Sequence, residues 1–210
     1  MQQKTKISKT KTVDSEFSEN YDRKRIEVLE ATWRAILLVG LENVTFREIA
    51  SQMKATTGTI VHYFRTKDEV LLYALDHLIS EMQDNIEKYV GKSTGLNRIE
   101  RTILATLPLD EESEMGWRIW FAFLKSSIGN NRLSNEHGRR YIFMRESLVA
   151  ELDLLRAQNL IRCDANLTLE ADAIVALADG IGVGRIIDPN RFPPKQQKVL
   201  VKRHIQAFLC

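Results

Sequence analysis

The chain has 210 residues, of which 44% are hydrophobic, enough for a buried core in one large domain or two small ones. Its net charge of +2 does not by itself indicate a nucleic-acid binder. No apolar run reaches the roughly 18–20 residues of a membrane span, and no signal-peptide core is present. Cys163 and Cys210 have no metal-ligand spacing, so we expect a reduced, cytoplasmic protein with no metal site.

The first segment of the chain is polar. Lys, Thr, Ser and Glu dominate it without an apolar stripe, which predicts a flexible basic arm over residues 1–21. Two interpretations remain open for this arm. It either adds contacts to a DNA backbone or groove, or it is a solvated tail.

The remainder of the sequence predicts an all-α protein, because apolar residues recur at helical spacing and no strand-like alternation occurs. A first helix ends at Gly40. Its expected apolar face consists of Ile26, Leu29, Trp33, Ile36 and Leu37. Thr45 and Glu48 have the spacing of a capping box for a second helix. A third helix ends near Phe64, and a fourth runs from Lys67 to about residue 89.

Two short helices joined by a tight turn predict a helix-turn-helix over residues 45–64. The second of them opens with the small residues Thr56-Thr57-Gly58-Thr59, which let its backbone approach DNA. Ile60 and Phe64 are expected to face the core of this domain. Lys67 lies in the first turn of the next helix, where the helix dipole disfavours a cation, and a nearby DNA phosphate would explain it. We therefore expect double-stranded DNA as a partner.

Further helices are expected beyond residue 95. They cover residues 96–107, a segment ending at 128, and residues 135–158, 168–187 and 195–208. Small residues along the helix at 168–187 allow another helix to approach closely, which predicts a dimer interface at Leu177, Gly180 and Gly184. The helix at 135–158 is its expected partner in a four-helix bundle across the two-fold axis.

An aromatic cluster forms the expected ligand site of this second region. Its members are Trp117, Trp120, Phe121 and Phe143. They either pack in the core or form the wall of a ligand pocket. Aromatic rings near Glu114 would suit a quaternary ammonium or polyamine through cation–π contact.

Residues 22–82 resemble the DNA-binding domain of the TetR family of bacterial repressors. The resemblance rests on the Gly40 stop and on the segments 45–50, 58–60, 63–64 and 66–69. It implies base contacts by Arg47, Thr57, Gly58 and Val61. It implies phosphate contacts by Thr45, Thr56, Thr59, His62, Tyr63 and Lys67. Two departures from the family pattern are Lys54, in place of a turn glycine, and Val61, in place of an aromatic residue. The segment 179–207 resembles the BetI-type C-terminal domain.

The resemblance implies a DNA-binding domain at 22–82 and a ligand-binding and dimerisation domain at 83–210. It implies a homodimeric repressor without a cofactor that binds a palindromic operator and is released by a small-molecule effector. Alternatives are an activator, or a redox-responsive regulator that uses Cys163 and Cys210. An enzyme is disfavoured, because no nucleophile has an adjacent base and the four histidines lack metal-ligand spacing.

Overall fold

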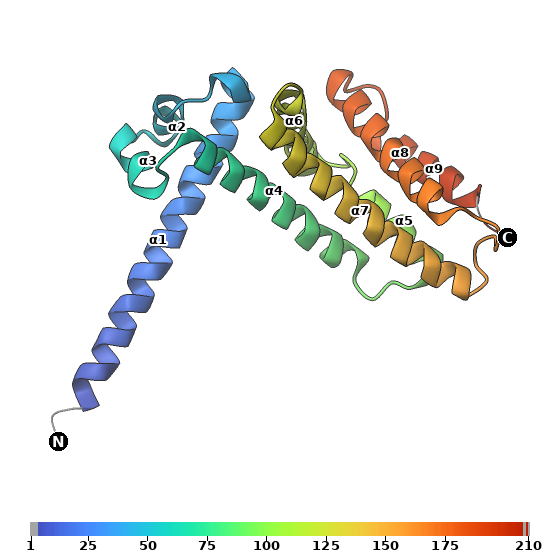
Figure 1. Ribbon diagram of the computed structural model, residues 1–210, viewed down its shortest axis with the longest axis horizontal. Helices are drawn as coiled ribbons and strands as arrows, with labels where there is room; N and C mark the ends of the chain where they lie inside the picture. The colour runs from blue at the N-terminus through green and yellow to red at the C-terminus, as the bar shows by residue number, and fades with distance from the viewer. Residues whose placement is uncertain (1–3, 208, 210) are drawn as a thin grey trace. The chain divides into compact units, whose positions relative to one another are not determined.

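The structure is a computed structural model that describes residues 4–207 and 209. Every regular element of this part is a helix, apart from one isolated bridge between Ile161 and Leu209. The helices, labelled in Figure 1, are α1 (Lys4–Val39), α2 (Phe46–Met53), α3 (Thr57–Tyr63), α4 (Lys67–Val90), α5 (Gly95–Ala105), α6 (Glu111–Ser127), α7 (Asn131–Ala157), α8 (Leu167–Ile187) and α9 (Pro194–Gln206), with a 3-10 turn η1 (Leu41–Asn43). The all-α prediction is confirmed. The expected end of the last helix at Phe208 lies outside the described residues.

The chain divides into two compact units between Asp76 and His77. We call the first unit the head and the second the body. The helix α4 begins in the head and continues into the body. None of the helices in the described part combines the length and apolar character that a bilayer crossing requires.

The core of the head forms where α1 packs against α2, and α2 against α3. Its largest fully buried side chains include Leu29, Ile36, Ile49, Ile60, Phe64 and Leu75. The expected inward direction of Ile60 and Phe64 is therefore confirmed. The prediction for Leu37 was wrong, since this side chain is 41% exposed. The buried stripe of α1 passes through Ile36, and the next residue along a helix points about 100° away from it.

The helix α1 is longer than expected. It begins at Lys4, where the sequence predicted an irregular arm. No Gly or Pro interrupts residues 4–39, and each residue added to an existing helix contributes a hydrogen bond without a new nucleation cost. The helical backbone of the packed part of α1 therefore continues into the polar segment. Figure 1 shows this blue helix continuing well past α2 and α3.

The turn between α2 and α3 requires a left-handed backbone. Lys54 ends α2 with φ 53° and ψ 38°, and the next amide, of Ala55, donates to the carbonyl oxygen of Ala50 at 2.9 Å. Glycine adopts this conformation without steric cost, whereas a side chain with a Cβ atom does not. The departure noted at Lys54 thus marks a real strain in the turn.

Replacing Lys54 by glycine should stabilise the head by about 1 kcal/mol, because it removes the left-handed penalty. The measurement is chemical unfolding at a fixed protein concentration. Lys54→Ala is the matched control, since it deletes the charge but keeps the Cβ atom. Equal stabilisation by both variants would mean that charge, and not backbone strain, matters at this position.

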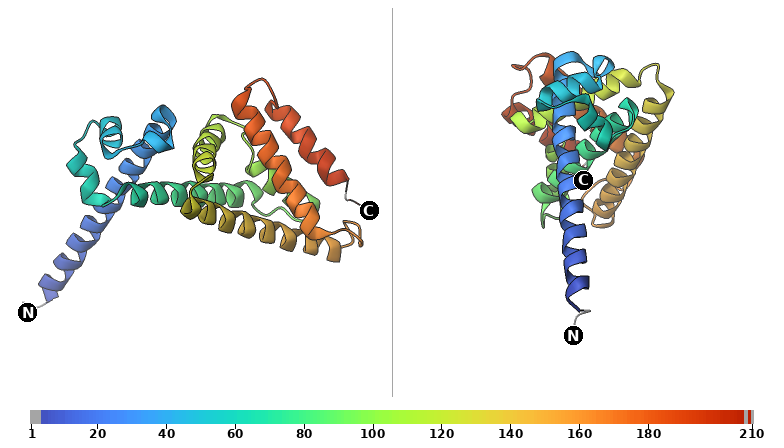
Figure 2. Two further views of the ribbon diagram at one scale, coloured as in Figure 1. Left: turned by 45° about the horizontal axis from the view of Figure 1, so that its top comes forward. Right: turned by 90° about the vertical axis from the view of Figure 1, so that its left-hand side faces the viewer.

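The body is a bundle in which α7 packs against α8, α6 contacts both, and α5 contacts α9 and α7. Figure 2 shows α7 in brown, α8 in orange and α9 in red as long helices of the body. Its core consists of aliphatic side chains such as Ile99, Leu152 and Val201. The helix α7 begins at Asn131, four residues earlier than expected. Asn130 explains this start, because its side-chain oxygen accepts the first free amides of the helix.

Candidate DNA-binding and effector sites

The helix α3 is amphipathic in the way that a recognition helix requires. Ile60 is buried in the head core, whereas Thr57, Gly58, Val61 and His62 are exposed. The exposed set includes the residues of this helix for which the family resemblance implies base contacts. A helix anchored on one face and small or polar on the other can enter a major groove.

The residues around the starts of α2 and α3 are also exposed. Thr45 precedes α2, and its hydroxyl oxygen accepts the Glu48 amide at 3.2 Å. That hydroxyl keeps its own proton, so capping the helix and donating to a phosphate are compatible. Arg47 projects from the first turn of α2 and is exposed. At the start of α3, the hydroxyl oxygens of the exposed Thr56 and the half-buried Thr59 lie 3.3 Å apart.

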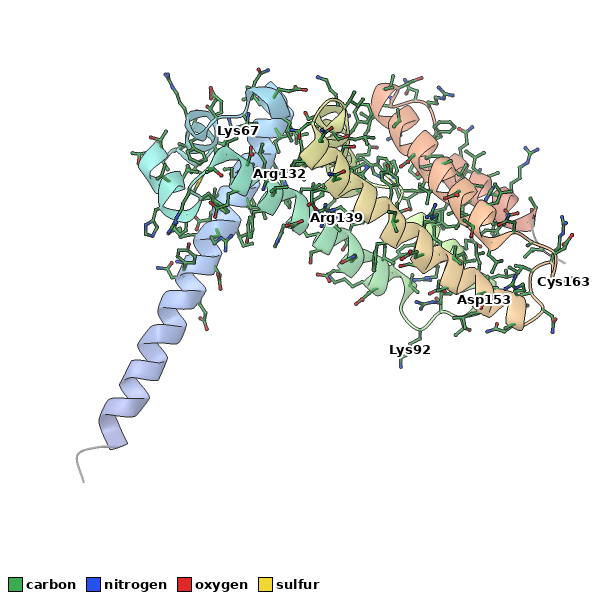
Figure 3. The ribbon with its side chains drawn as sticks, viewed as in Figure 1. Lys67, Lys92, Arg132, Arg139, Asp153 and Cys163 are labelled. Atoms are coloured by element: carbon green, nitrogen blue, oxygen red, sulfur yellow. The ribbon has the colours of Figure 1, made fainter. Side chains whose placement is uncertain are left out.

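Lys67 has a partner that the sequence did not reveal. Its ammonium group donates a hydrogen bond to the carbonyl oxygen of Glu42 at 2.8 Å, across 25 residues of sequence. The bond ties the start of α4, where Figure 3 labels Lys67, to η1, which follows α1. This hydrogen bond within the chain therefore explains why a positively charged Lys67 lies in the first turn of α4. An ammonium group has three donors, so a phosphate contact remains available to it.

Lys67→Ala should weaken binding to specific and random duplexes by the same factor. It should also lower the slope of log affinity against log salt by about 0.9, because one counterion fewer is released. The measurement is a salt titration of DNA affinity. Lys92→Ala is the control, since it removes the same charge from an exposed turn of the body (Figure 3). An equal fall in slope for both variants would indicate a general charge effect.

A ring cluster at the end of α3 includes a residue from α1. The ring centroid of Tyr21 lies 5.1 Å from that of Tyr63 and 6.3 Å from that of His62. Residue spacing did not indicate this contact, because Tyr21 lies at the edge of the expected arm. One turn further along α1, the guanidinium carbon of Arg25 lies 5.0 Å from the Phe64 ring centroid and 4.3 Å from that of Tyr73.

In the body, the four predicted pocket residues do not share one environment. Trp117 is half-buried, donates its indole N–H to the Thr106 carbonyl oxygen at 2.8 Å, and lies against Gly182. Trp120 and Phe121 are also half-buried. Phe143 is 60% exposed. The helix α7 therefore directs Phe143 to its outer side, away from the bundle core.

Glu114 is already neutralised. Its carboxylate lies 2.5 Å from one guanidinium nitrogen of Arg185 on α8, and both side chains are about four-fifths buried. Arg185 also donates to the carbonyl oxygen of Pro189. The expectation that Glu114 would attract a cationic ligand was therefore wrong, because an internal cation occupies that position.

A different carboxylate lies near the aromatic rings. The Tyr141 hydroxyl on α7 donates to Asp179 on α8 at 3.0 Å, and the Trp120 ring centroid lies 5.9 Å from that of Tyr141 and 4.5 Å from that of His137. Only 3% of His137 is exposed. We call these four residues the Asp179 cluster. Three helices contribute to it, so sequence spacing could not reveal it.

Burial controls the charges of the Asp179 cluster. It raises the pKa of Asp179, while the hydrogen bond from Tyr141 acts in the opposite direction. Burial, followed by the nearby positive charge of Arg140, lowers the pKa of His137. Burial and the Asp179 carboxylate raise the pKa of Tyr141 well above its usual range. The cluster thus holds one half-buried carboxylate beside aromatic faces and a neutral imidazole.

A cavity of about 390 Å³ lies elsewhere in the body. Residues from the end of α4, the end of α5 and the start of α6 line it, including Tyr89, Leu104 and Asp110. None of the four predicted pocket residues is among its lining residues. Its volume is within the range of small-molecule sites.

Apolar side chains remain exposed on α7 and α8. Phe143 and Leu154 on α7 and Leu169 on α8 are each at least 60% exposed. Leu177 is half-buried, and Gly180 is exposed with open space around it.

Gly184 differs from Gly180, because it is buried. A Cβ atom at Gly184 would lie 2.6 Å from the ring of Phe192 in the same chain. The close approach of Phe192 in the same chain therefore explains the glycine at this position, without a partner subunit.

Cys163 is exposed in the connection between α7 and α8 (Figure 3). Its neighbours Arg162 and Asp164 pair with each other at 2.8 Å. Cys210, its proposed redox partner, lies outside the described residues.

Comparison with known families gives two matches that together span most of the chain. A model of the tetR family of bacterial regulatory proteins matches residues 28–74. A model of the C-terminal domain of BetI-type transcriptional repressors matches residues 96–209.

Individual proteins show the same similarity. The transcriptional regulator PksA of Bacillus subtilis (strain 168) is 27% identical over 191 residues, which cover 90% of this chain and 91% of PksA. The regulator BetI of Serratia proteamaculans (strain 568) is 26% identical over 188 residues, covering 87% of this chain and 90% of BetI. A transcriptional regulator from Saccharomonospora viridis, solved in complex with choline, superposes with a TM-score of 0.80 at 22% identity, covering 88% of this chain and 96% of the other. The superposition shows a shared fold.

Proposed function

Because this chain belongs to the TetR family of bacterial regulatory proteins and carries a BetI-type C-terminal domain, we propose that it is a dimeric repressor released from its operator by a small molecule. Members of this family are transcriptional regulators and not enzymes. The observation that carries the proposal is the exposed small and polar face of α3, held on the head core by Ile60. The protein would act on chromosomal DNA in the cytoplasm.

In this proposal, each DNA-contacting residue of the head has one of two roles. Arg47, Thr57, Gly58 and Val61 contact base edges and so determine sequence preference. The phosphate contacts position the head without reading sequence, and are made by Thr45, Thr56, Thr59, His62, Tyr63 and Lys67. Two heads of a dimer would bind half-sites about 34–36 Å apart, so the operator should be palindromic.

The test is footprinting on the DNA upstream of the protein's own gene. We expect protection of a site with two-fold symmetry, and binding to that site about 10³-fold or more tighter than to random duplex at physiological salt. Equal affinity for both duplexes would contradict a sequence-specific regulator. Transcription in the presence of the bound protein then separates a repressor from an activator.

The exposed apolar side chains on α7 and α8 support a dimer formed by these two helices. Large apolar side chains that remain exposed on a helix face favour an interaction surface, and a two-fold interface presents the same face twice. Leu177 and Gly180 belong to the proposed interface, with Phe143, Leu154 and Leu169. Gly184 is omitted from it because Phe192 covers it.

We further propose that the effector is a small organic cation bound at the Asp179 cluster. Trp120 and Tyr141 offer aromatic faces, Asp179 offers a carboxylate, and His137 offers a neutral ring. Trp117 and Phe121 are the neighbouring aromatic residues on α6. The choline bound to the Saccharomonospora viridis protein supports this ligand class.

The helix α4 would transmit effector binding, because it begins at Lys67 in the head and continues to Val90 in the body. A ligand that favours one arrangement of α4 shifts the population between DNA-competent and released states.

The redox alternative rests on the exposed thiol of Cys163. It predicts that peroxide abolishes operator binding, whereas effector control predicts that peroxide has no effect.

A further inference from the structure

Tyr21 is the aromatic residue through which α1 reaches the exposed end of the recognition helix. It lies seven residues before the segment that matches the family model, which begins at residue 28. Its ring contacts two side chains of α3 for which we propose phosphate contacts, His62 and Tyr63. The rings of His62 and Tyr63 themselves meet edge to face, with centroids 4.8 Å apart. We call these three residues the ring triad.

The contact with Tyr21 holds the side chains at the end of α3, which the short helix itself restrains little. The helix has seven residues, and Phe64 follows it with an extended backbone at φ −138° and ψ 121°. His62 and Tyr63 thus lie in the last turn of a short helix, where few backbone hydrogen bonds restrain them and side chains lose more freedom on binding. A ring fixed from another helix reduces that loss, because part of the ordering exists before DNA arrives.

The neighbours of Tyr21 on α1 do not share this role. Arg23 donates to Asn20 at 2.8 Å, and Lys24 pairs with Glu27 at 2.7 Å, so both engage residues of their own helix. Arg25 reaches α3 as well, but through the buried Phe64 ring. Arg25 therefore contacts the core side of the α3 end, and Tyr21 contacts its outward-facing rings.

We propose that Tyr21 is a positioning residue of the DNA-binding surface, which holds the Tyr63 hydroxyl and the His62 imidazole ready for the DNA backbone. This inference rests on the proposed function, because it needs those two side chains to meet phosphates. Phosphate contacts carry no sequence information, so loss of Tyr21 weakens binding to every duplex by the same factor. An aromatic pair contributes an affinity factor of about 2 to 10.

The experiment uses the full-length protein and two DNA probes, the footprinted operator and a random duplex. Tyr21→Ala is expected to weaken binding to both probes by about 2- to 10-fold. Tyr21→Phe keeps the ring and is expected to bind like the wild type. In a background that carries His62→Ala and Tyr63→Ala, Tyr21→Ala is expected to have almost no further effect, because the rings it positions are gone.

Three results would overturn the inference. Unchanged affinity of Tyr21→Ala would show that the triad does not contribute. A loss in Tyr21→Phe equal to that in Tyr21→Ala would make the Tyr21 hydroxyl a direct contact. A full effect of Tyr21→Ala in the double-alanine background would assign the loss to the stability of the head. Equal affinity of the wild type for both probes is a separate outcome, which removes the proposed function and not the triad.

Discussion

Leu154→Glu should convert the dimer into monomers and reduce operator affinity by more than about 100-fold. Leu154 is 60% exposed in the single chain, so the substitution leaves the fold of the body intact. In the proposed interface it would bury an unpaired carboxylate on each side of the two-fold axis, at a cost of about 3–5 kcal/mol for each charge. A monomer has one head and loses the second half-site contact. Sedimentation gives the mass, and a DNA titration gives the affinity.

Val199→Glu is the matched control for this prediction. Val199 lies on α9 and is 57% exposed, so the same charge is introduced at a site of similar exposure outside the proposed interface. This variant should remain dimeric and bind its operator normally. Dimers of Leu154→Glu, or monomers of Val199→Glu, would relocate the interface away from α7 and α8.

Asp179→Asn should reduce affinity for an organic cation by about 10- to 100-fold, the factor expected when a charged hydrogen-bonding contact becomes neutral. The asparagine carbonyl can still accept the Tyr141 hydroxyl proton, so the α7–α8 contact is retained. Choline serves as the probe. Fluorescence of Trp120 reports binding, and release of operator DNA reports induction. The two readouts should give one apparent affinity, since effector and operator binding are linked.

The affinity for choline should also depend on pH. Burial raises the pKa of Asp179, and a cation binds the ionised carboxylate. As the pH falls, binding should therefore weaken at a higher pH than it would with an ordinary aspartate, and this dependence should disappear in Asp179→Asn.

Asp172→Asn provides the control for the cation site. Asp172 is also on α8, but it is exposed and lies 3.8 Å from Arg145. Choline should bind this variant as it binds the wild type. If Asp179→Asn keeps the wild-type response while Asp172→Asn loses it, the effector site lies elsewhere, and the cavity bordered by Tyr89 and Leu104 becomes the next candidate.

The sequence by itself determined the features of this protein that depend on short stretches of chain. Gly40 was predicted to end α1, and its φ of 78° suits glycine. Thr45 was predicted to begin α2, and Lys54 to occupy a strained turn. Spacing within α3 placed Ile60 and Phe64 inward. Each of these depends on hydrogen bonds and periodicity within a few residues, which the local sequence specifies directly.

The tertiary structure decided which distant side chains meet. Lys67 and Glu42 are 25 residues apart, and Tyr141 and Asp179 are 38 apart. Arg185 neutralises Glu114 across 71 residues, which removed the cation site expected there. Helical periodicity gives the face on which a residue lies but not which helix covers that face, because the packing of whole helices fixes their neighbours. For this reason the sequence identified the recognition helix, and only the fold identified Tyr21 and the Asp179 cluster.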